Sequence, residues 1–103
     1  MHSHNVYFWL KEGLSKSDLL GFEKGLDSLM MTRLVISGSY GKPADTHREV
    51  VENTYTYGLS LQFKDTPDHN HYQADPIHLA FVEKHSAKWN RVKVFDVEIK
   101  KSR

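Results

Sequence analysis

Cysteine is absent from the 103 residues, so the chain has neither a disulfide framework nor thiol chemistry. No apolar run approaches the roughly 20 residues that a membrane-spanning helix needs. The first eleven residues also lack the apolar segment of a secretory signal. We therefore expect a cytoplasmic protein without a membrane partner. Positive and negative charges are nearly balanced, because the chain has 14 Lys and Arg and 13 Asp and Glu. That balance argues against a dedicated nucleic-acid binder, so no nucleic-acid partner is expected.

Aromatic and β-branched residues gather in four short segments, each typical of a β-strand. These segments are residues 4–11, 34–40, 54–64 and 92–100. Helical spacing of apolar residues predicts a first helix over 15–30, with Ser15 as its N-cap, and a last helix over 77–90. Pro67 and Asp68 can start a short helix through residue 74, and Asp75 followed by Pro76 restarts the chain as a helix. No linker or repeat interrupts the chain, so we expect one domain over residues 1–103.

The order of these elements is strand, helix, strand, strand, helices, strand. This is the ferredoxin-like β-α-β-β-α-β plan, an α+β fold with one antiparallel sheet and its helices on one face. Gly21 and Gly25 weaken the first helix by about 1 kcal/mol each relative to Ala. Two glycines one turn apart would also let another element approach closely.

Strand alternation assigns side chains to the two faces of the sheet. The helix-facing set is Val6, Phe8, Leu10, Leu59, Leu61 and Phe63, with Tyr55 and Tyr57 on the same face of the third strand. The opposite face keeps Tyr7, Trp9 and, in the last strand, Val94. Bare aromatics on an open sheet face suggest an interaction surface, so we expect a homodimer. A monomer with a partly amphipathic outer face is the alternative.

Four short motifs carry a family resemblance. They are HNVYFWLK at residues 4–11, Tyr55-Thr56, DPIHLAFV at 75–82 and VFDV at 94–97. With them the chain resembles the stress-responsive dimeric A/B-barrel (Dabb) family over nearly its whole length. The resemblance implies a ferredoxin-like protomer and a homodimeric α/β barrel built from two sheets. It implies no single activity: some members are known only as stress-induced stable proteins, and a plant member is a polyketide cyclase that catalyses an intramolecular aldol step without a cofactor. No cofactor is therefore expected.

Tyr72 and His78 are the candidate catalytic residues. His78 falls in the first turn of the last helix, where the positive end of the helix dipole disfavours a protonated imidazole. A neutral imidazole can accept a proton as a general base, and the Tyr72 hydroxyl could polarise a carbonyl. The resemblance implies that cyclase-like members use a Tyr and a His at these two positions, and that they carry a first-strand histidine matched by His4. Tyr57 stands where those enzymes have a third-strand histidine.

His4, Tyr57, Leu59 and Phe81 are the candidate ligand-binding residues, because all four are expected between the sheet and the helices. They would surround a small hydrophobic or carbonyl ligand. Catalysis, ligand binding without turnover, and a structural role for His78 all remain open. A cavity of a few hundred cubic ångströms under His78 would favour a ligand site. The leading hypothesis is a homodimeric A/B-barrel protein with a small-molecule pocket, and the alternative is a cofactor-independent enzyme performing acid–base chemistry on a carbonyl compound.

Two further polar clusters are interpreted as solvated surface. Asp68, His69, His71 and Asp75 could in principle bind a metal. Their spacing is not a recognised zinc pattern, however, and residues two apart on a helix point away from each other, so no metal site is expected. The basic cluster consists of Lys84, Lys88, Arg91, Lys93, Lys100, Lys101 and Arg103. In the last helix, His85 is expected as a partly buried histidine with a polar partner, and Trp89 as core.

Overall fold

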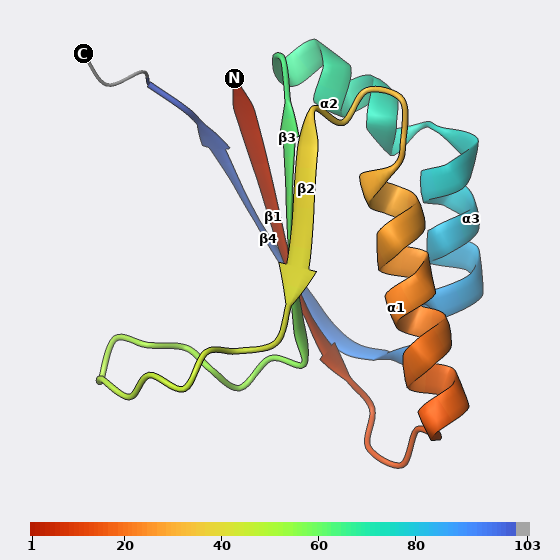
Figure 1. Cartoon of the computed structure of the whole chain (residues 1–103), viewed down its shortest axis with the longest axis vertical. Coiled ribbons are helices and arrows are strands. Elements are labelled where there is room, and N and C mark those ends of the chain that lie inside the picture. The colour runs from red at the N-terminus through yellow and green to blue at the C-terminus, as the bar shows by residue number, and fades with distance from the viewer. Residues whose placement is uncertain (101–103) are drawn as a thin grey trace.

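The computed structural model describes residues 1–100 of the chain. Its elements, in chain order, are β1 (His2–Leu10), α1 (Lys16–Met30), β2 (Ser37–Gly41), β3 (Tyr57–Phe63), α2 (Thr66–Gln73), α3 (Pro76–His85), the 3-10 turn η1 (Ser86–Lys88) and β4 (Trp89–Glu98). The strands form one antiparallel sheet in the order β2-β3-β1-β4. Figure 1 shows this sheet edge-on, with all the helices on one side. The predicted ferredoxin-like α+β fold is therefore confirmed.

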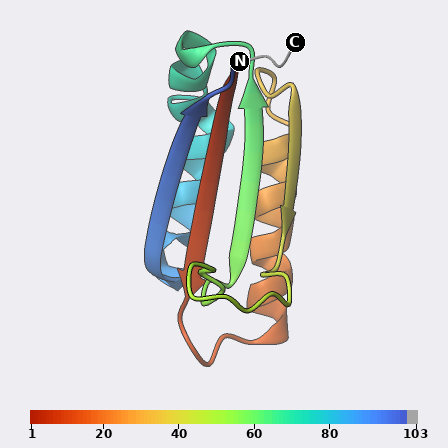
Figure 2. The ribbon, with the colours of Figure 1, turned by 90° about the vertical axis from the view of Figure 1, so that its left-hand side faces the viewer.

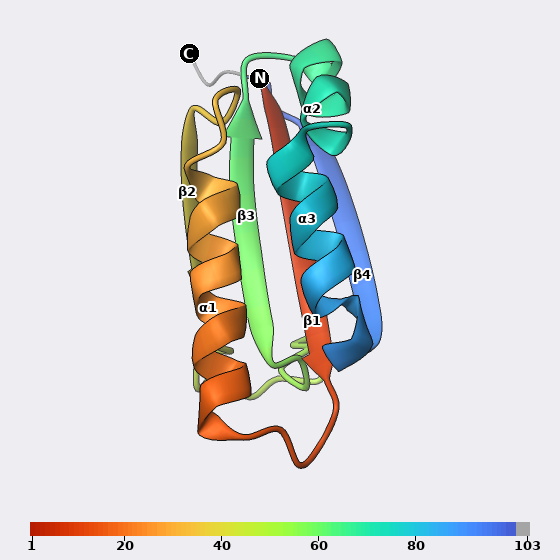
Figure 3. The ribbon, with the colours of Figure 1, turned by 90° about the vertical axis from the view of Figure 1, so that its right-hand side faces the viewer.

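The core lies between the sheet and the helices. Figure 3 shows α1 lying over β2 and β3, with α3 lying over β1 and β4. Phe22 of α1 is fully buried and meets Phe8 of β1 edge-on, with ring centroids 5.2 Å apart. The helix-facing set predicted from alternation is buried throughout: Val6, Phe8, Leu10, Leu59, Leu61 and Phe63. This packing holds the helices at a fixed height above the strands and so sets the space available for a site.

The last helix is shorter than its apolar spacing predicts. α3 ends at His85, and a single 3-10 turn leads into β4 at Trp89. Trp89 pairs with Leu10 beside an irregularity in β1, and Lys11 N donates to the Lys88 carbonyl. The indole still packs on Phe8, with ring centroids 5.6 Å apart. Trp89 is thus a partly buried residue that packs against the core from a strand, because pairing with β1 prevails over helical spacing at this point.

Two residues lie on the face opposite to the one predicted. Val94 faces the helices, because it pairs directly with Val6 across β1 and β4. Tyr55 lies on the open face, where its ring meets that of Tyr7 at 4.9 Å. The alternation does not extend back to Tyr55, since β3 begins only at Tyr57 and Thr56 uses both its amide and its hydroxyl to bind β1.

Figure 2 shows the face of the sheet that no helix covers. The segment 42–56 projects to this side, away from the helices (Figure 1). A hollow of about 380 Å³ lies on this open face, and aromatic side chains form much of its wall: Tyr7, Trp9, Tyr55 and Phe95. The guanidinium of Arg91 lies over the Trp9 ring, 4.5 Å from its centroid. Among the described helices, none combines the length and apolar character needed to cross a membrane.

Candidate functional site

A cavity of about 110 Å³ lies between the sheet and α3. Strands β1 and β3 contribute His4 and Leu59 to its wall, and the helical segments contribute Tyr72, His78 and Phe81. The cavity therefore brings together five of the six site residues predicted from the sequence. Its volume is below the roughly 300–1,000 Å³ typical of drug-sized sites and closer to the cavity of about 150 Å³ that admits benzene.

Tyr57 is the predicted site residue that does not line this cavity. Its side chain lies under α1, with the ring 5.5 Å from that of Phe22. Its hydroxyl donates a hydrogen bond of 2.5 Å to the Glu23 carboxylate. Burial and this carboxylate raise the pKa of Tyr57 well above its usual value. Tyr57 faces the helices as alternation predicts, but it lies beneath α1, whereas the cavity lies beneath α3.

His78 is held as a neutral imidazole. Its Nδ1 lies 3.0 Å from the Gln73 carbonyl oxygen. A carbonyl can only accept, so Nδ1 carries the proton and Nε2 keeps its lone pair. Burial lowers the pKa of His78 and prevails over the opposing effect of the Gln73 hydrogen bond. The imidazole in the cavity wall can therefore accept a proton at neutral pH.

Tyr72 supplies a hydroxyl beside that imidazole. Its side chain is almost fully buried, and its ring lies 4.9 Å from the His78 ring and 6.0 Å from the His4 ring. Burial, followed by the charge of Asp75, raises the pKa of Tyr72. The phenol thus stays protonated at neutral pH and can donate a hydrogen bond. A donor and a base side by side could act on one carbonyl compound.

Trp89 is one of the residues that line the cavity, and its indole carries a buried donor. Its indole Nε1 is buried and has no hydrogen-bond partner among the residues that the structure describes. Leaving a buried donor unmet costs about 1–3 kcal/mol. The sequence interpretation of Trp89 as core did not anticipate this.

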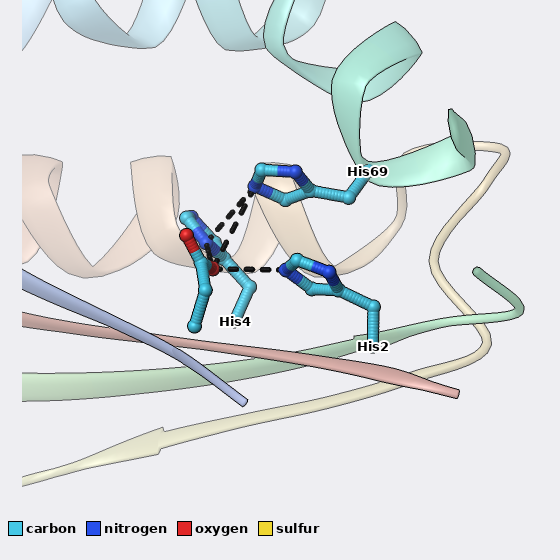
Figure 4. A group of neighbouring side chains, drawn as sticks. His2, His4 and His69 are labelled. Carbon is cyan, nitrogen blue, oxygen red and sulfur yellow. Dashed lines mark hydrogen bonds and ion pairs between the residues drawn. The ribbon is translucent and has the colours of Figure 1, made fainter. Parts of the chain in front are cut away.

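Three buried histidines and one carboxylate meet at the end of the sheet next to the cavity. Figure 4 shows His2 and His4 on β1 turned toward His69 of α2. Asp96 of β4 completes the group, and His4 belongs both to it and to the cavity wall. Sequence reasoning missed this cluster. The available signal was the pair of histidines two residues apart on one strand, which alternation directs to the same face.

The metal-ligand candidates considered from sequence spacing do not assemble. The Asp75 carboxylate caps α3 by accepting from the Ile77 amide, and Asp68 pairs with Lys64 at 3.8 Å. His71 is exposed, whereas His69 turns inward to the cluster. The four residues are thus divided between helix capping, an ion pair, solvent and the cluster.

In the basic cluster, Lys88 donates 2.9 Å to the Asp18 carbonyl and contacts His85, which is the buried histidine with a polar partner that the sequence predicts. Lys101 and Arg103 lie outside the described residues.

The family model described as "Stress responsive A/B Barrel Domain" matches residues 3–99. No curated protein sequence matches significantly. Among solved structures, the Arabidopsis thaliana protein At3g17210 superposes with a TM-score of 0.82 at 21% identity, covering 100% of this chain and 99% of that one. A ferredoxin-like protein of Thermobifida fusca, described as dimeric and of unknown function, gives 0.77 at 11% identity, with coverages of 95% and 90%. A hydroxynitrile lyase of Passiflora edulis gives 0.80 at 16% identity, with coverages of 99% and 95%. Identities this low show the shared fold alone.

Proposed function

Because the chain belongs to the stress-responsive A/B barrel (Dabb) family, we propose that it acts as a homodimer in which each subunit binds a small carbonyl or other hydrophobic molecule. The observation that carries this proposal is the cavity under α3, where apolar walls meet Tyr72, His78 and His4. Mostly apolar walls with a few convergent polar groups are typical of small-molecule sites. The small volume restricts the ligand to about the size of benzene.

The open face supports the dimer. Phe95 on this face is 51% exposed, and Tyr7 and Trp9 line the same hollow. A second copy packed against this face would bury these rings symmetrically. The related Thermobifida fusca protein is itself described as dimeric. Sedimentation equilibrium should give about twice the 12.0 kDa chain mass; a species of only 12.0 kDa at micromolar concentration would contradict the dimer.

Ligand binding can be followed through the fluorescence of Trp89. In a Trp9→Phe background, Trp89 is the remaining tryptophan, since the chain has two. We expect titration with cyclopentanone, a ketone about the size of benzene, to change its emission saturably. Val82→Phe should abolish this change by filling the cavity that Val82 lines. Leu79→Phe is the matched control, because Leu79 lies on the same helix and is 55% exposed. Equal responses in both variants, or no saturable response in the parent, would contradict the site.

One observation favours the enzyme as a second candidate: the hydrogen bond from His78 Nδ1 to Gln73 leaves Nε2 as a free base beside a phenol. In this reaction, Nε2 would take the α-proton of a ketone while the Tyr72 hydroxyl hydrogen-bonds to the developing enolate oxygen. The test is deuterium uptake by acetone in D₂O, measured by NMR. We expect His78→Ala to slow protein-dependent exchange by about 10²–10⁴-fold. Unchanged exchange in that variant would defeat the assignment of His78 as the base.

A further inference from the structure

Four potential metal ligands converge at one end of the sheet. His2 and His4 lie two residues apart on β1 and project to the same, helix-covered face. Asp96 of β4 pairs directly with His4, so its side chain emerges on that face as well. His69 approaches from α2 above them (Figure 4). The fold thus joins chain positions 2, 4, 69 and 96 in one group.

The distances between the ligand atoms lie on both sides of the spacing in a tetrahedral centre. Asp96 Oδ1 lies 2.6 Å from His4 Nδ1, 2.9 Å from His2 Nε2 and 3.8 Å from His69 Nε2. His69 Nε2 lies 3.2 Å from His4 Nδ1, and all four atoms lie within 4.8 Å of one another. Zn–N bonds of about 2.0–2.1 Å place tetrahedral ligands about 3.3 Å apart. A cation would therefore fit between them with small rotations of the side chains.

Outer hydrogen bonds prepare two of the imidazoles for this role. His69 Nδ1 lies 3.1 Å from the Asn70 amide oxygen, and the Gln73 amide nitrogen lies 3.3 Å from His69 Nε2. The Asn70 oxygen accepts the Nδ1 proton, so Nε2 carries the lone pair, and a metal ion would displace the Gln73 amide from it. His2 Nδ1 lies 3.1 Å from the Thr66 hydroxyl, which can accept its proton when Nε2 is the ligand. Partners of this kind orient metal-binding histidines.

Burial and charge also suit a cation. His2, His4 and His69 are each less than a tenth exposed, while the Asp96 side chain is 40% exposed and leaves an approach from solvent. Three neutral imidazoles and one carboxylate carry a single negative charge. Imidazole nitrogen selects zinc and similar transition metals, because Mg²⁺ and Ca²⁺ prefer oxygen ligands.

We propose that His2, His4, His69 and Asp96 form a binding site for one Zn²⁺ or a similar divalent transition metal per chain. When the metal binds, it replaces the proton on His4 Nδ1 and the proton on His2 Nε2, and the other nitrogen of each ring takes up a proton from solvent, so all three imidazoles stay neutral. The site lies outside the ligand cavity except for His4, and it does not depend on the proposed function.

Isothermal titration of the chelator-treated, full-length protein with ZnCl₂ tests this proposal. We expect one ion per chain, with a dissociation constant of about 1 µM or lower. Titration with Co²⁺ should give the intense visible bands of a tetrahedral centre. Asp96→Asn and His69→Ala should each weaken binding by at least about 100-fold, and Thr66→Val by about 10-fold. His71→Ala is the matched control on the same helix and should bind like the parent, because His71 is exposed and lies outside the cluster.

Circular dichroism must show that each variant is folded before its affinity is compared. Thr66→Val keeps all four ligands, so its expected loss provides a test even if His69→Ala does not fold. The proposal is overturned if the parent binds neither ion, or if the His71 variant loses as much affinity as the cluster variants. It is also overturned if Asp96→Asn and Thr66→Val bind as tightly as the parent.

Discussion

Gly25 of α1 lies directly against the imidazole of His85 on α3. A Cβ atom at position 25 would stand 2.8 Å from His85 Nε2 and 2.9 Å from the Phe81 ring. Of the two α1 glycines expected to admit a close neighbour, Gly25 does so. The close approach of these helices positions Phe81, which forms part of the cavity wall.

Gly25→Ala should therefore destabilise the protein. Overpacking against buried rings costs about 1–3 kcal/mol, whereas replacing glycine with alanine in a helix gains about 1 kcal/mol. We expect a net loss of up to about 2 kcal/mol in the free energy of unfolding, measured by urea denaturation. Gly21→Ala is the control, because its Cβ would meet only the flexible end of Lys88 at 3.6 Å. That variant should gain up to about 1 kcal/mol; equal effects of the two substitutions would refute the steric argument.

His85 makes stability depend on pH. Its burial, followed by the charges of Lys88 and Lys84, lowers the pKa of this imidazole. As the pH falls through about 6.5, the unfolded chain takes up a proton here, while the folded chain does not until a lower pH. The folded state then binds fewer protons than the unfolded state, so the free energy of unfolding falls on acidification. The contribution of His85 to stability is complete above about pH 6.5.

Urea titrations at pH 7.5 and pH 5.5 measure this effect. His85→Gln should show a smaller loss of stability between the two values than the parent. Part of the loss should remain in the variant, since burial also lowers the pKa of His4 and His78. An equal loss in both proteins, or greater stability at pH 5.5, would count against the role of His85.

The fold follows from local patterns, but several element boundaries do not. Alternation along β1 and β3 assigned the buried side of the sheet correctly, because side-chain direction in a strand depends only on residue parity. The predicted end of the last helix was wrong, because Phe81, His85 and Trp89 have helical spacing whether or not the helix continues. Pairing of Trp89 with Leu10, a contact distant in sequence, decides where β4 begins.

The candidate site, like the fold, could be predicted from the sequence only in part. The sequence predicts that His4, Tyr72 and His78 lie between the sheet and the helices, and one cavity brings them together. The histidine cluster could not be derived, because no spacing along the chain relates Asp96 to His69. Their meeting depends on the register that pairs His4 with Asp96 and on the position of α2 above that pair.

Tyr57→Phe distinguishes a structural tyrosine from a ligand-binding one. Removing the hydroxyl that donates to Glu23 should cost about 1.5–3 kcal/mol of stability, as for hydrogen bonds to charged groups. Cyclopentanone binding, followed by Trp89 fluorescence, should be unchanged because Tyr57 does not line the cavity. Tyr72→Phe should weaken that binding, since it removes a hydroxyl from the cavity wall. Loss of binding in the Tyr57 variant would instead show that Tyr57 takes part in ligand binding.

Phe95→Asp should dissociate the proposed dimer without unfolding the subunit. Half of this ring is exposed on the open face, so a single chain can accommodate a carboxylate there, whereas an apolar interface cannot. We expect a loss of at least about 2 kcal/mol in association, or roughly 30-fold in the dissociation constant. Sedimentation velocity measures the shift toward the 12.0 kDa chain, and circular dichroism checks the fold. Leu79→Asp is the matched control: Leu79 is 55% exposed but lies on α3, on the helix-covered side of the sheet. If Leu79→Asp dissociates the protein while Phe95→Asp does not, the two copies meet through their helices and the open sheet face is not the interface.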